Sequence, residues 1–335
     1  IDQVKEGISL LNADKPAIEG DLFYNGDIDQ WKKFGNSLLL RLGMRLSKVK
    51  PELAAATAKA AIEGGIMSEA KDMCRVKHIA GGRDEDKNPV ALRFQKDDYI
   101  GQGKVKISQT FMNHLQATND PRIAVFCSLK DGNADPSIQK GLPNGYDKNT
   151  ISTNSDYTGK LEDYSNFNTN VILREDAPTL LLMPSESKLL QAEAALRNWV
   201  AGDPEALYKE AIRLSMQEQK EAYGVSISEQ QVNDYLAQNL FANAASQEEK
   251  LEVLGNEYWV TTFMNGYESY ANWRRCGYPK LTPTHYAGNE SNGQIPRRLP
   301  YAIDEYTINK ANVEQAVQQQ GADNLNTRIW WDVAK

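Results

Sequence analysis

The sequence has few cysteines, no excess of positive charge and no long apolar run. Its three cysteines, Cys74, Cys127 and Cys276, are an odd number without short spacing, a pattern that predicts neither a disulfide framework nor a zinc site. Lysine and arginine total 38 against 45 aspartates and glutamates, and the net charge of −7 offers no broad basic surface to nucleic-acid phosphates. No stretch reaches the roughly 18 apolar residues that a membrane-spanning helix needs. We therefore expect a globular chain that neither binds nucleic acid nor spans a membrane.

The sequence also lacks the short motifs that mark common enzyme classes. It contains no nucleophile elbow, no His-Glu-x-x-His motif, no phosphate-binding glycine loop and no dinucleotide fingerprint. Its only histidines are His78, His114 and His285, and nothing near them indicates a Ser-His-Asp or Cys-His arrangement. We predict no catalytic residue and no cofactor. Two catalytic carboxylates far apart in the sequence would leave no such trace, so an enzyme remains an alternative.

One acidic stretch partly matches a calcium-binding loop. Asp131, Asn133 and Asp135 have the spacing of the first three ligands of such a loop. The sixth position is Pro136, where the loop requires glycine, and the twelfth is Leu142, where it requires glutamate. We therefore predict a turn at this stretch and no metal site in the chain.

A long helix with an aromatic face is predicted between Ser246 and Pro279. Ser246 and Glu249 form a capping box, in which each side chain satisfies a backbone N–H at the start of the helix. Apolar residues then recur mostly three and four positions apart, which places them on one face. These residues are Leu251, Leu254, Tyr258, Thr262, Phe263, Gly266, Tyr267, Tyr270 and Trp273. Such a face has to be covered by other helices.

Further helices are expected, several of them in pairs joined by short turns. Proline at a first helical position and glycine just past the last one mark the boundaries, as at Pro51, Gly64 and the Gly202-Asp203-Pro204 turn. The predicted helical segments are residues 1–11, 21–49, 51–62, 185–199, 204–223, 228–241 and 309–320. In residues 21–49 the expected buried stripe consists of Trp31, Phe34, Leu38, Leu42, Leu46 and Val49, with Leu39, Leu40 and Met44 at its sides. The fold class is mainly α.

Four stretches resemble the SusD/RagB family, the surface glycan-binding lipoproteins of glycan-foraging Gram-negative bacteria. Residues 26–45 match its G-D-x-x-x-W-x-K-F-x-N-S-L-x-L-R-L-x-M-R pattern, and residues 273–279, Trp-Arg-Arg-Cys-Gly-Tyr-Pro, are similar to its W-x-x-R-R-x-G-x-P ending, with the tryptophan directly before the arginine pair. Residues 295–309 are similar to its I-P-R-R-x-x-Y-P-x-x-E segment, with Ala302 in place of the usual proline, and residues 326–332 end in W-W-D. The signature residues are Trp31, Arg41, Arg45, Trp273, Arg274, Arg275, Arg297, Arg298, Trp330 and Trp331.

The resemblance implies a SusD-like helical scaffold with tetratricopeptide-like helix pairs and long irregular loops. We expect one such domain over residues 1–335 that lacks its N-terminal part. It divides into a helical hairpin region (1–127), a loop-rich candidate binding region (128–179) and a helical region with the C-terminal signature (180–335).

The same resemblance implies a non-catalytic function. The protein would bind an oligosaccharide or related nutrient at the cell surface and deliver it to a SusC-like TonB-dependent transporter of the outer membrane. It would be exported and held at the membrane only through an N-terminal lipid anchor that this chain does not include. The alternatives are a glycoside hydrolase and a helical-repeat adaptor that binds only protein.

The loop-rich region supplies the candidate ligand-binding residues. Residues 128–179 have few sustained apolar periods and many Gly, Asn, Asp, Ser and Pro residues, and a connection of this length inside a domain is usually functional or disordered. Aromatic rings flanked by amides and carboxylates suit sugars, which present apolar C–H faces and a rim of hydroxyls. The candidates are Tyr146, Asp147, Tyr157, Tyr164 and Asn168. The alternative is that they are ordinary loop residues that pack locally and form turns.

Two arginine pairs near the C-terminus could be read as anion sites, but we predict a structural role for them. Arginine forms paired hydrogen bonds with carboxylates and stacks on aromatic rings. Suitable partners lie nearby in the sequence, namely Trp273, Tyr278, Glu305, Trp330, Trp331 and Asp332. We therefore expect Arg274-Arg275 and Arg297-Arg298 to fasten the C-terminal tail to the long helix.

Overall fold

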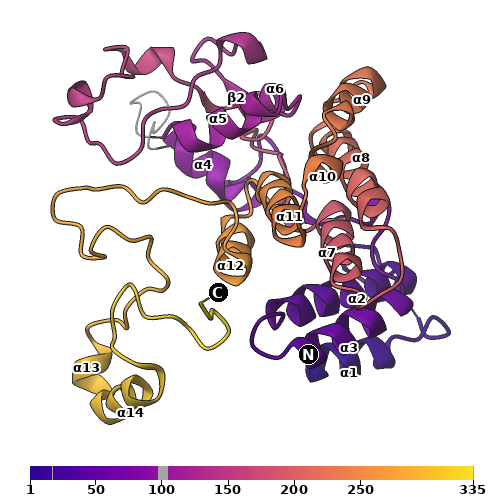
Figure 1. The fold of residues 1–335 in the computed structure, drawn as a ribbon. Helices are drawn as coiled ribbons and strands as arrows, with labels where there is room; N and C mark the ends of the chain where they lie inside the picture. Colours follow the sequence, from indigo (N-terminus) through magenta and orange to yellow (C-terminus); the bar gives the residue numbers. More distant parts are fainter. Residues whose placement is uncertain (17, 97–104, 335) are drawn as a thin grey trace.

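The computed structural model describes residues 1–16, 18–96 and 105–334, and helices dominate it (Figure 1). The helices are α1 (Asp2–Leu10), α2 (Ile28–Arg45), α3 (Pro51–Glu63), α4 (Pro89–Lys96), α5 (Gln109–Ala117), α6 (Ile123–Phe126), α7 (Pro184–Leu196), α8 (Pro204–Tyr223), α9 (Glu229–Ala237), α10 (Leu240–Asn243), α11 (Gln247–Thr261), α12 (Gly266–Cys276), α13 (Glu305–Ile308) and α14 (Lys310–Gln320). Two short antiparallel ladders pair β1 (Cys74–Val76) with β4 (Thr179–Leu182) and β2 (Cys127–Ser128) with β3 (Asn166–Phe167). Among the described residues, no helix combines the length and apolar content that crossing a bilayer requires.

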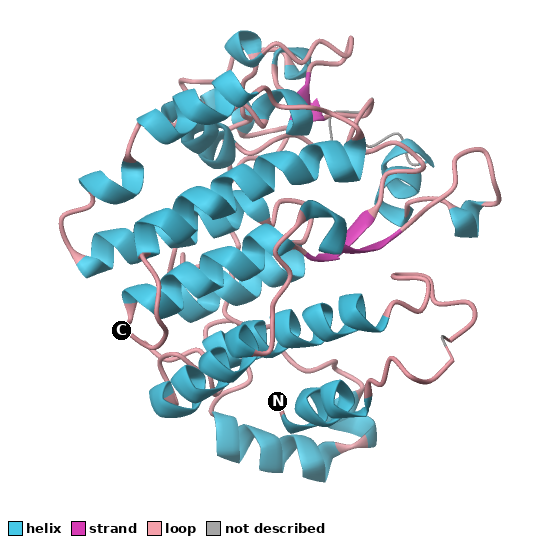
Figure 2. Cartoon of the chain, turned by 90° about the vertical axis from the view of Figure 1, so that its right-hand side faces the viewer, coloured by secondary structure: helices cyan, strands magenta, loops and turns pink. Residues whose placement is uncertain are grey.

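Helices, drawn in cyan in Figure 2, make up most of the regular structure. In two helix pairs, α2–α3 and α7–α8, the partners pack against each other, and α2 also contacts α7. Local sequence explains where they begin. The Asp27 side chain accepts hydrogen bonds from the first backbone N–H groups of α2, and Asp203 does the same for α8. Pro51 and Pro204 occupy the first helical positions, where a missing N–H costs nothing. The predicted helix pairs are confirmed.

The helix α2 packs on several sides, and the apolar residues beside its predicted stripe are the most deeply buried. Leu39, Leu40 and Met44 are 0–3% exposed and belong to the largest core cluster. Trp31 and Phe34 are only partly buried and pack in a smaller cluster around the β1–β4 ladder. The reason is that α2 contacts α1, α3 and α7 on different sides, so no single stripe defines its interior.

The prediction of one long helix from Ser246 to Pro279 is wrong in one respect. The structure divides this stretch into two helices, α11 and α12 (Figure 1). Met264 has a left-handed backbone with φ of 73°, and the Asn265 side chain caps the new helix. The Thr262 hydroxyl donates to the Tyr258 carbonyl and also contacts the Ser269 hydroxyl. Such local side-chain bonds compete with helix continuation. The apolar stripe runs across the break, so periodicity alone does not reveal it.

A buried ionic network joins four helices of the scaffold. Arg41 of α2 binds Glu186 of α7 through two hydrogen bonds of 2.5 and 2.7 Å. Arg45 binds Glu268 of α12 at 2.7 Å, and the Tyr258 hydroxyl of α11 lies within hydrogen-bond distance of both Glu186 and Glu268, at 2.8 and 2.9 Å. Glu186 is 1% exposed and Glu268 is 8% exposed. Two of the signature arginines therefore hold helices together.

A second network surrounds Glu193 in the middle of α7. Arg275 of α12 donates to both carboxylate oxygens at 2.7 Å, and Arg197 donates to one of them at 2.9 Å. Arg275 also binds the Asn272 side chain, so its charge is fully engaged. These cations hold the pKa of Glu193 well below its usual range, although burial opposes them. Arg275 thus fastens α12 to α7 and not to the C-terminal tail.

The C-terminal tail is held by the other arginines of the two pairs. Arg297 binds Asp332 and lies over the Trp273 ring at 4.2 Å. Arg274 lies over the Trp331 ring at 4.9 Å. Arg298 instead binds Asp323 at 2.8 Å.

Of the two adjacent tail tryptophans, only one is enclosed. Arg45 also lies over the Trp331 ring, at 5.2 Å, so this ring sits between two guanidinium groups from different helices. Trp330, by contrast, is 66% exposed. Trp331 and Asp332, and not Trp330, hold the tail.

Candidate functional site

The loop-rich segment 128–179 is folded against the chain just before α5. The backbone N–H of Ile107 donates to the Ser165 carbonyl at 2.9 Å, and Leu142 donates to Ile107 at 2.8 Å. Gln109 N–H donates in turn to the Leu142 carbonyl at 2.9 Å. These ladder-like bonds tie two points within the loop, Leu142 and Ser165, to the residues just before α5. The acidic stretch at 131–135 forms consecutive side-chain-to-backbone turns, as predicted.

A glycine permits the closest backbone approach in this region. A Cβ atom added to Gly141 would lie 2.4 Å from the Gln109 Cα and 2.6 Å from the Ser108 carbonyl oxygen. Because these neighbours are backbone atoms, they cannot move aside like a flexible side chain. Gly141 therefore brings the loop into contact with the first turn of α5.

A pocket of about 390 Å³ opens where this loop meets the end of α11 and the segment after α12. The lining includes uncharged polar side chains, which are Ser108, Thr110, Asn144, Thr282, Thr284, Asn289, Ser291 and Gln294. The apolar part of the lining consists of Trp259, Leu281, Pro283, Ile295, Pro296 and Leu325. A concave surface that combines apolar walls with converging hydroxyl and amide groups can bind a small polar ligand. We refer to it as the loop pocket.

The aromatic wall of the loop pocket is set by helix packing. Trp259 lies near the C-terminal end of α11 and is partly buried. Its ring packs edge-on against Phe111 at 4.9 Å between centroids and lies 5.6 Å from the His114 ring, both on α5. Burial lowers the pKa of His114. The two helices therefore fix the indole before any ligand arrives.

Next to the lining residues Asn144 and Thr284, two loops contact each other. The Tyr286 hydroxyl donates to the Asp147 carboxylate at 2.9 Å. This bond, with others from Asn149 and Thr150, lowers the pKa of Asp147 to about 2. Gly145 has φ of 84°, and an added Cβ would lie 2.7 Å from the Thr284 Cβ. The loops thus touch closely next to the pocket.

The five predicted ligand-binding residues fall into two groups. Tyr146 is 40% exposed, and it lies between Gly145 and Asp147 in the chain. Tyr164 and Asn168 are each 2% exposed. Tyr157 is partly buried, with its ring stacked on Tyr164 at 5.8 Å. None of the five residues lines the loop pocket: Tyr146 and Asp147 follow the lining residue Asn144 in the chain, and the other three lie within the loop itself.

The two buried residues have structural partners in place of ligand contacts. The Tyr164 hydroxyl donates to the Asp156 carbonyl and accepts from the Thr158 N–H. The Asn168 amide donates to the Ala124 carbonyl, and its oxygen accepts from the Asn170 N–H. Because their polar groups are used inside the protein, these residues do not belong to an exposed site.

The sequence analysis did not identify Trp259 or the segment 281–296 as parts of a site. Trp259 lies on a helix whose apolar stripe indicated only core packing. The segment 281–296 resembles 128–179 in being rich in Thr, Asn, Gly and Pro. This composition indicates an exposed loop and was the only sign in the sequence that the segment could take part in binding. Its contact with a loop more than 100 residues earlier forms only in the folded protein, so the sequence alone does not reveal it.

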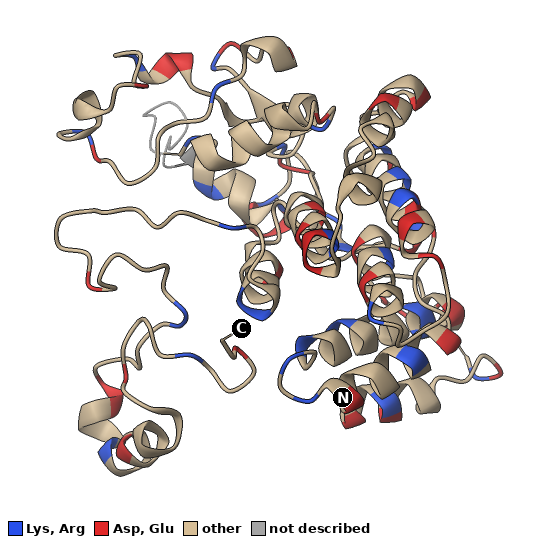
Figure 3. Cartoon of the chain, viewed as in Figure 1, with Lys and Arg blue, Asp and Glu red and all other residues tan. Residues whose placement is uncertain are grey.

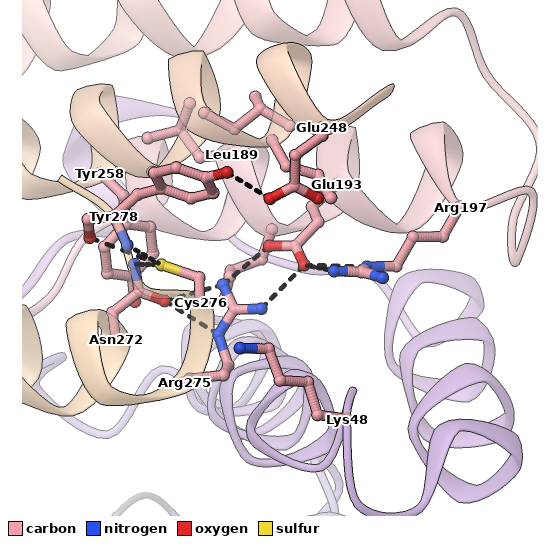
Figure 4. A pocket seen from close by; sticks show the side chains of 14 residues that line it. Lys48, Leu189, Glu193, Arg197, Glu248, Tyr258, Asn272, Arg275, Cys276 and Tyr278 are labelled. Atoms are coloured by element: carbon pink, nitrogen blue, oxygen red, sulfur yellow. Dashed lines mark hydrogen bonds and ion pairs between the residues drawn. The ribbon is translucent and has the colours of Figure 1, made fainter. Parts of the chain in front are cut away.

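A second pocket, of about 270 Å³, lies between α7, α11 and α12 (Figure 4). Figure 4 shows that polar and charged side chains in it point toward one another, with Arg275 bound to Glu193 and the Tyr278 hydroxyl to Glu248. It is therefore part of the ionic scaffold. In the described residues, no group of three or more His, Cys, Asp or Glu side chains is arranged to hold a metal ion.

Comparison with known proteins gives consistent matches. A family model described as SusD-like, starch-binding and associating with the outer membrane matches residues 1–302. A solved chitin-binding protein is 31% identical, with a TM-score of 0.85 over 99% of this chain and 71% of its own. A chitin-binding SusD homologue from Flavobacterium johnsoniae is 27% identical, with a TM-score of 0.77 over 100% of this chain and 70% of its own. No curated protein matches the chain.

A SusD homologue from Bacteroides uniformis is also similar, at 27% identity and a TM-score of 0.82 over 99% of this chain and 71% of its own. The resemblance inferred from the tryptophan and arginine signatures is thereby confirmed, as is the mainly helical fold class. The chain belongs to the SusD-like family.

Proposed function

We propose that this protein binds an oligosaccharide at the cell surface and that the loop pocket is its binding site. The observation that carries the proposal is the lining of that pocket, where Trp259 stands among hydroxyl and amide side chains. An indole can stack on the C–H face of a sugar ring while amides and hydroxyls bind its hydroxyl groups. The starch-binding description of the family and the chitin-binding names of two solved relatives support a glycan as the ligand.

Binding without catalysis fits the chemistry around the pocket. Hydrolysis of a glycosidic bond needs a carboxylic acid that holds a proton near neutral pH, together with a second carboxylate. The lining contains no carboxylate among the described residues. Asp147, where the two loops meet, has its pKa lowered to about 2, so it is ionised at neutral pH and cannot donate a proton. These features favour a binding protein over a glycoside hydrolase.

The proposed partner is a SusC-like TonB-dependent transporter of the outer membrane, to which the bound glycan would be delivered. The family description as associating with the outer membrane supports an exported, surface-exposed location. A lipid anchor preceding this chain would hold it there. Co-purification of the transporter without any glycan binding would instead support an adaptor that binds only protein.

Alanine substitution of two lining amides tests the site. Asn144→Ala combined with Gln294→Ala should weaken binding at least tenfold, because each lost hydrogen bond to a neutral ligand contributes about 1 kcal/mol. Both side chains are exposed, so the unfolding midpoint should not change. The measurement is calorimetric titration with chitotetraose, cellotetraose and maltotetraose.

A matched control removes two exposed amides from α14. The variant Asn312→Ala/Gln315→Ala should bind as the unmodified protein does. Equal affinity of the Asn144/Gln294 variant and this control would show that the glycan binds elsewhere. No binding of any of these tetramers, nor of the acidic and other neutral oligosaccharides on an array, would contradict glycan binding itself.

A further inference from the structure

The loop pocket lacks charge in its lining. Among the described residues that form it, no side chain is ionisable, and the polar groups of the side chains are hydroxyls, amides and the Trp259 indole N–H. The segment 281–296 carries a single charged residue, the acidic Glu290. Figure 3 shows this segment almost free of basic and acidic colouring between two basic residues at its ends. A ligand in this pocket would therefore meet dipoles and apolar surface but no ionic partner.

The two basic residues that flank this segment bind acidic side chains outside the pocket. Lys280 binds Glu252 of α11. Arg297 binds Asp332, donates to the Arg274 carbonyl and stacks on Trp273. Their charges are thus neutralised within the protein and do not serve the pocket.

The charges that do lie beside the pocket are mainly acidic. Asp147 lies where the two loops meet, bonded to Tyr286, and Asp156 accepts a hydrogen bond from Gln109, which lies between two lining residues. Lys148 is exposed in the same turn as Asp147 and lies outside the lining, so this turn adds no net positive charge. An anionic ligand would find no compensation here.

Physical chemistry then discriminates between classes of glycan. Moving a carboxylate or sulfate from water to a site without a cation has a large unfavourable desolvation free energy. Uncharged sugars exchange hydrogen bonds with water for hydrogen bonds with amides and hydroxyls at little net cost. A binding site commonly gains specificity when its electrostatic environment is unfavourable to a competing ligand.

We propose that the loop pocket selects uncharged glycans and rejects those that contain uronic acid or sulfate groups. This inference rests on the proposed function of the same pocket. The lack of a cation in the lining, more than any single contact, would be the basis of this selection.

The first test is an oligosaccharide array. It would carry neutral tetramers of N-acetylglucosamine, glucose, xylose and mannose together with tetragalacturonate and a heparin tetrasaccharide. We expect binding of at least one neutral tetramer and at least tenfold weaker binding of both acidic ones at pH 7. Acidic tetramers that bind as tightly as the best neutral one would overturn the inference and leave glycan binding intact. Absence of binding to every tetramer would overturn both.

The second test changes the charge of the pocket. Gln294 has an exposed side chain, and its place in the turn is fixed by its backbone. Gln294→Lys should raise the affinity for tetragalacturonate about fivefold or more, and added salt should reduce this gain. Gln294→Glu, of similar size, should produce no gain. Equal effects of the two variants on tetragalacturonate would contradict selection by charge.

Discussion

Replacing Arg122 with methionine is expected to lower the free energy of unfolding by about 3–5 kcal/mol. The Arg122 side chain is fully buried at the start of α6 and binds Asp120 at 2.6 Å and Glu257 of α11 at 2.7 Å. It also donates to the Ser215 hydroxyl of α8. Methionine fills similar space but leaves two buried carboxylates without a cation, and this uncompensated charge is the source of the loss.

An exposed ion pair provides the control for Arg122. Arg213 of α8 binds Glu229 of α9, with side chains that are 41% and 72% exposed. Arg213→Met should change stability by no more than about 1 kcal/mol, since exposed pairs contribute little. Urea unfolding of both variants, followed by circular dichroism, measures the difference. Similar losses for the two would show that Arg122 stabilises the protein only by filling space.

Glu218→Gln is expected to make stability less dependent on pH. Glu218 of α8 is buried, and its carboxyl group meets the N–H and hydroxyl of Ser185 at 2.8 and 2.5 Å. Burial raises its pKa from 4.5 to about 8. Because the folded state binds the proton more tightly than the unfolded state, this contribution is complete below pH 4.5. It is lost as the pH rises through about 8, at up to about 1.4 kcal/mol per unit.

Glutamine is neutral at every pH and keeps the shape of the protonated acid. The stability of Glu218→Gln relative to the unmodified protein should therefore increase steadily between pH 5 and pH 8. Urea unfolding at unit pH intervals measures this difference. Glu210→Gln, at a 59% exposed position of the same helix, should give a difference that hardly changes with pH. A flat profile for Glu218→Gln as well would mean that Glu218 is ionised in the folded protein.

Helix boundaries could be predicted where a side chain bonds to backbone only a few residues away. The capping box of Ser246 with Glu249 and that of Ser228 with Gln231 both form as the sequence indicates. The break after Thr261 could not be predicted, because the apolar stripe continues through it. Its cause is a set of hydrogen bonds between α11 and α12 that exist only once the helices fold back on each other.

The candidate site could be predicted only in part. Loop composition pointed to Tyr146 and Asp147, which follow the lining residue Asn144 in the chain but are not part of the lining of the loop pocket. The same composition also pointed to Tyr164, which is buried, since aromatic content alone does not indicate exposure. Trp259 becomes part of the site only through the tertiary meeting of α11 with two distant loops.

The most direct measurement is a crystal structure of the protein bound to its best neutral tetramer. We expect a sugar ring in the loop pocket, in van der Waals contact with the Trp259 indole and within hydrogen-bond distance of Asn144. A tetramer bound instead between α7 and α11, or on a surface away from Trp259, would contradict it.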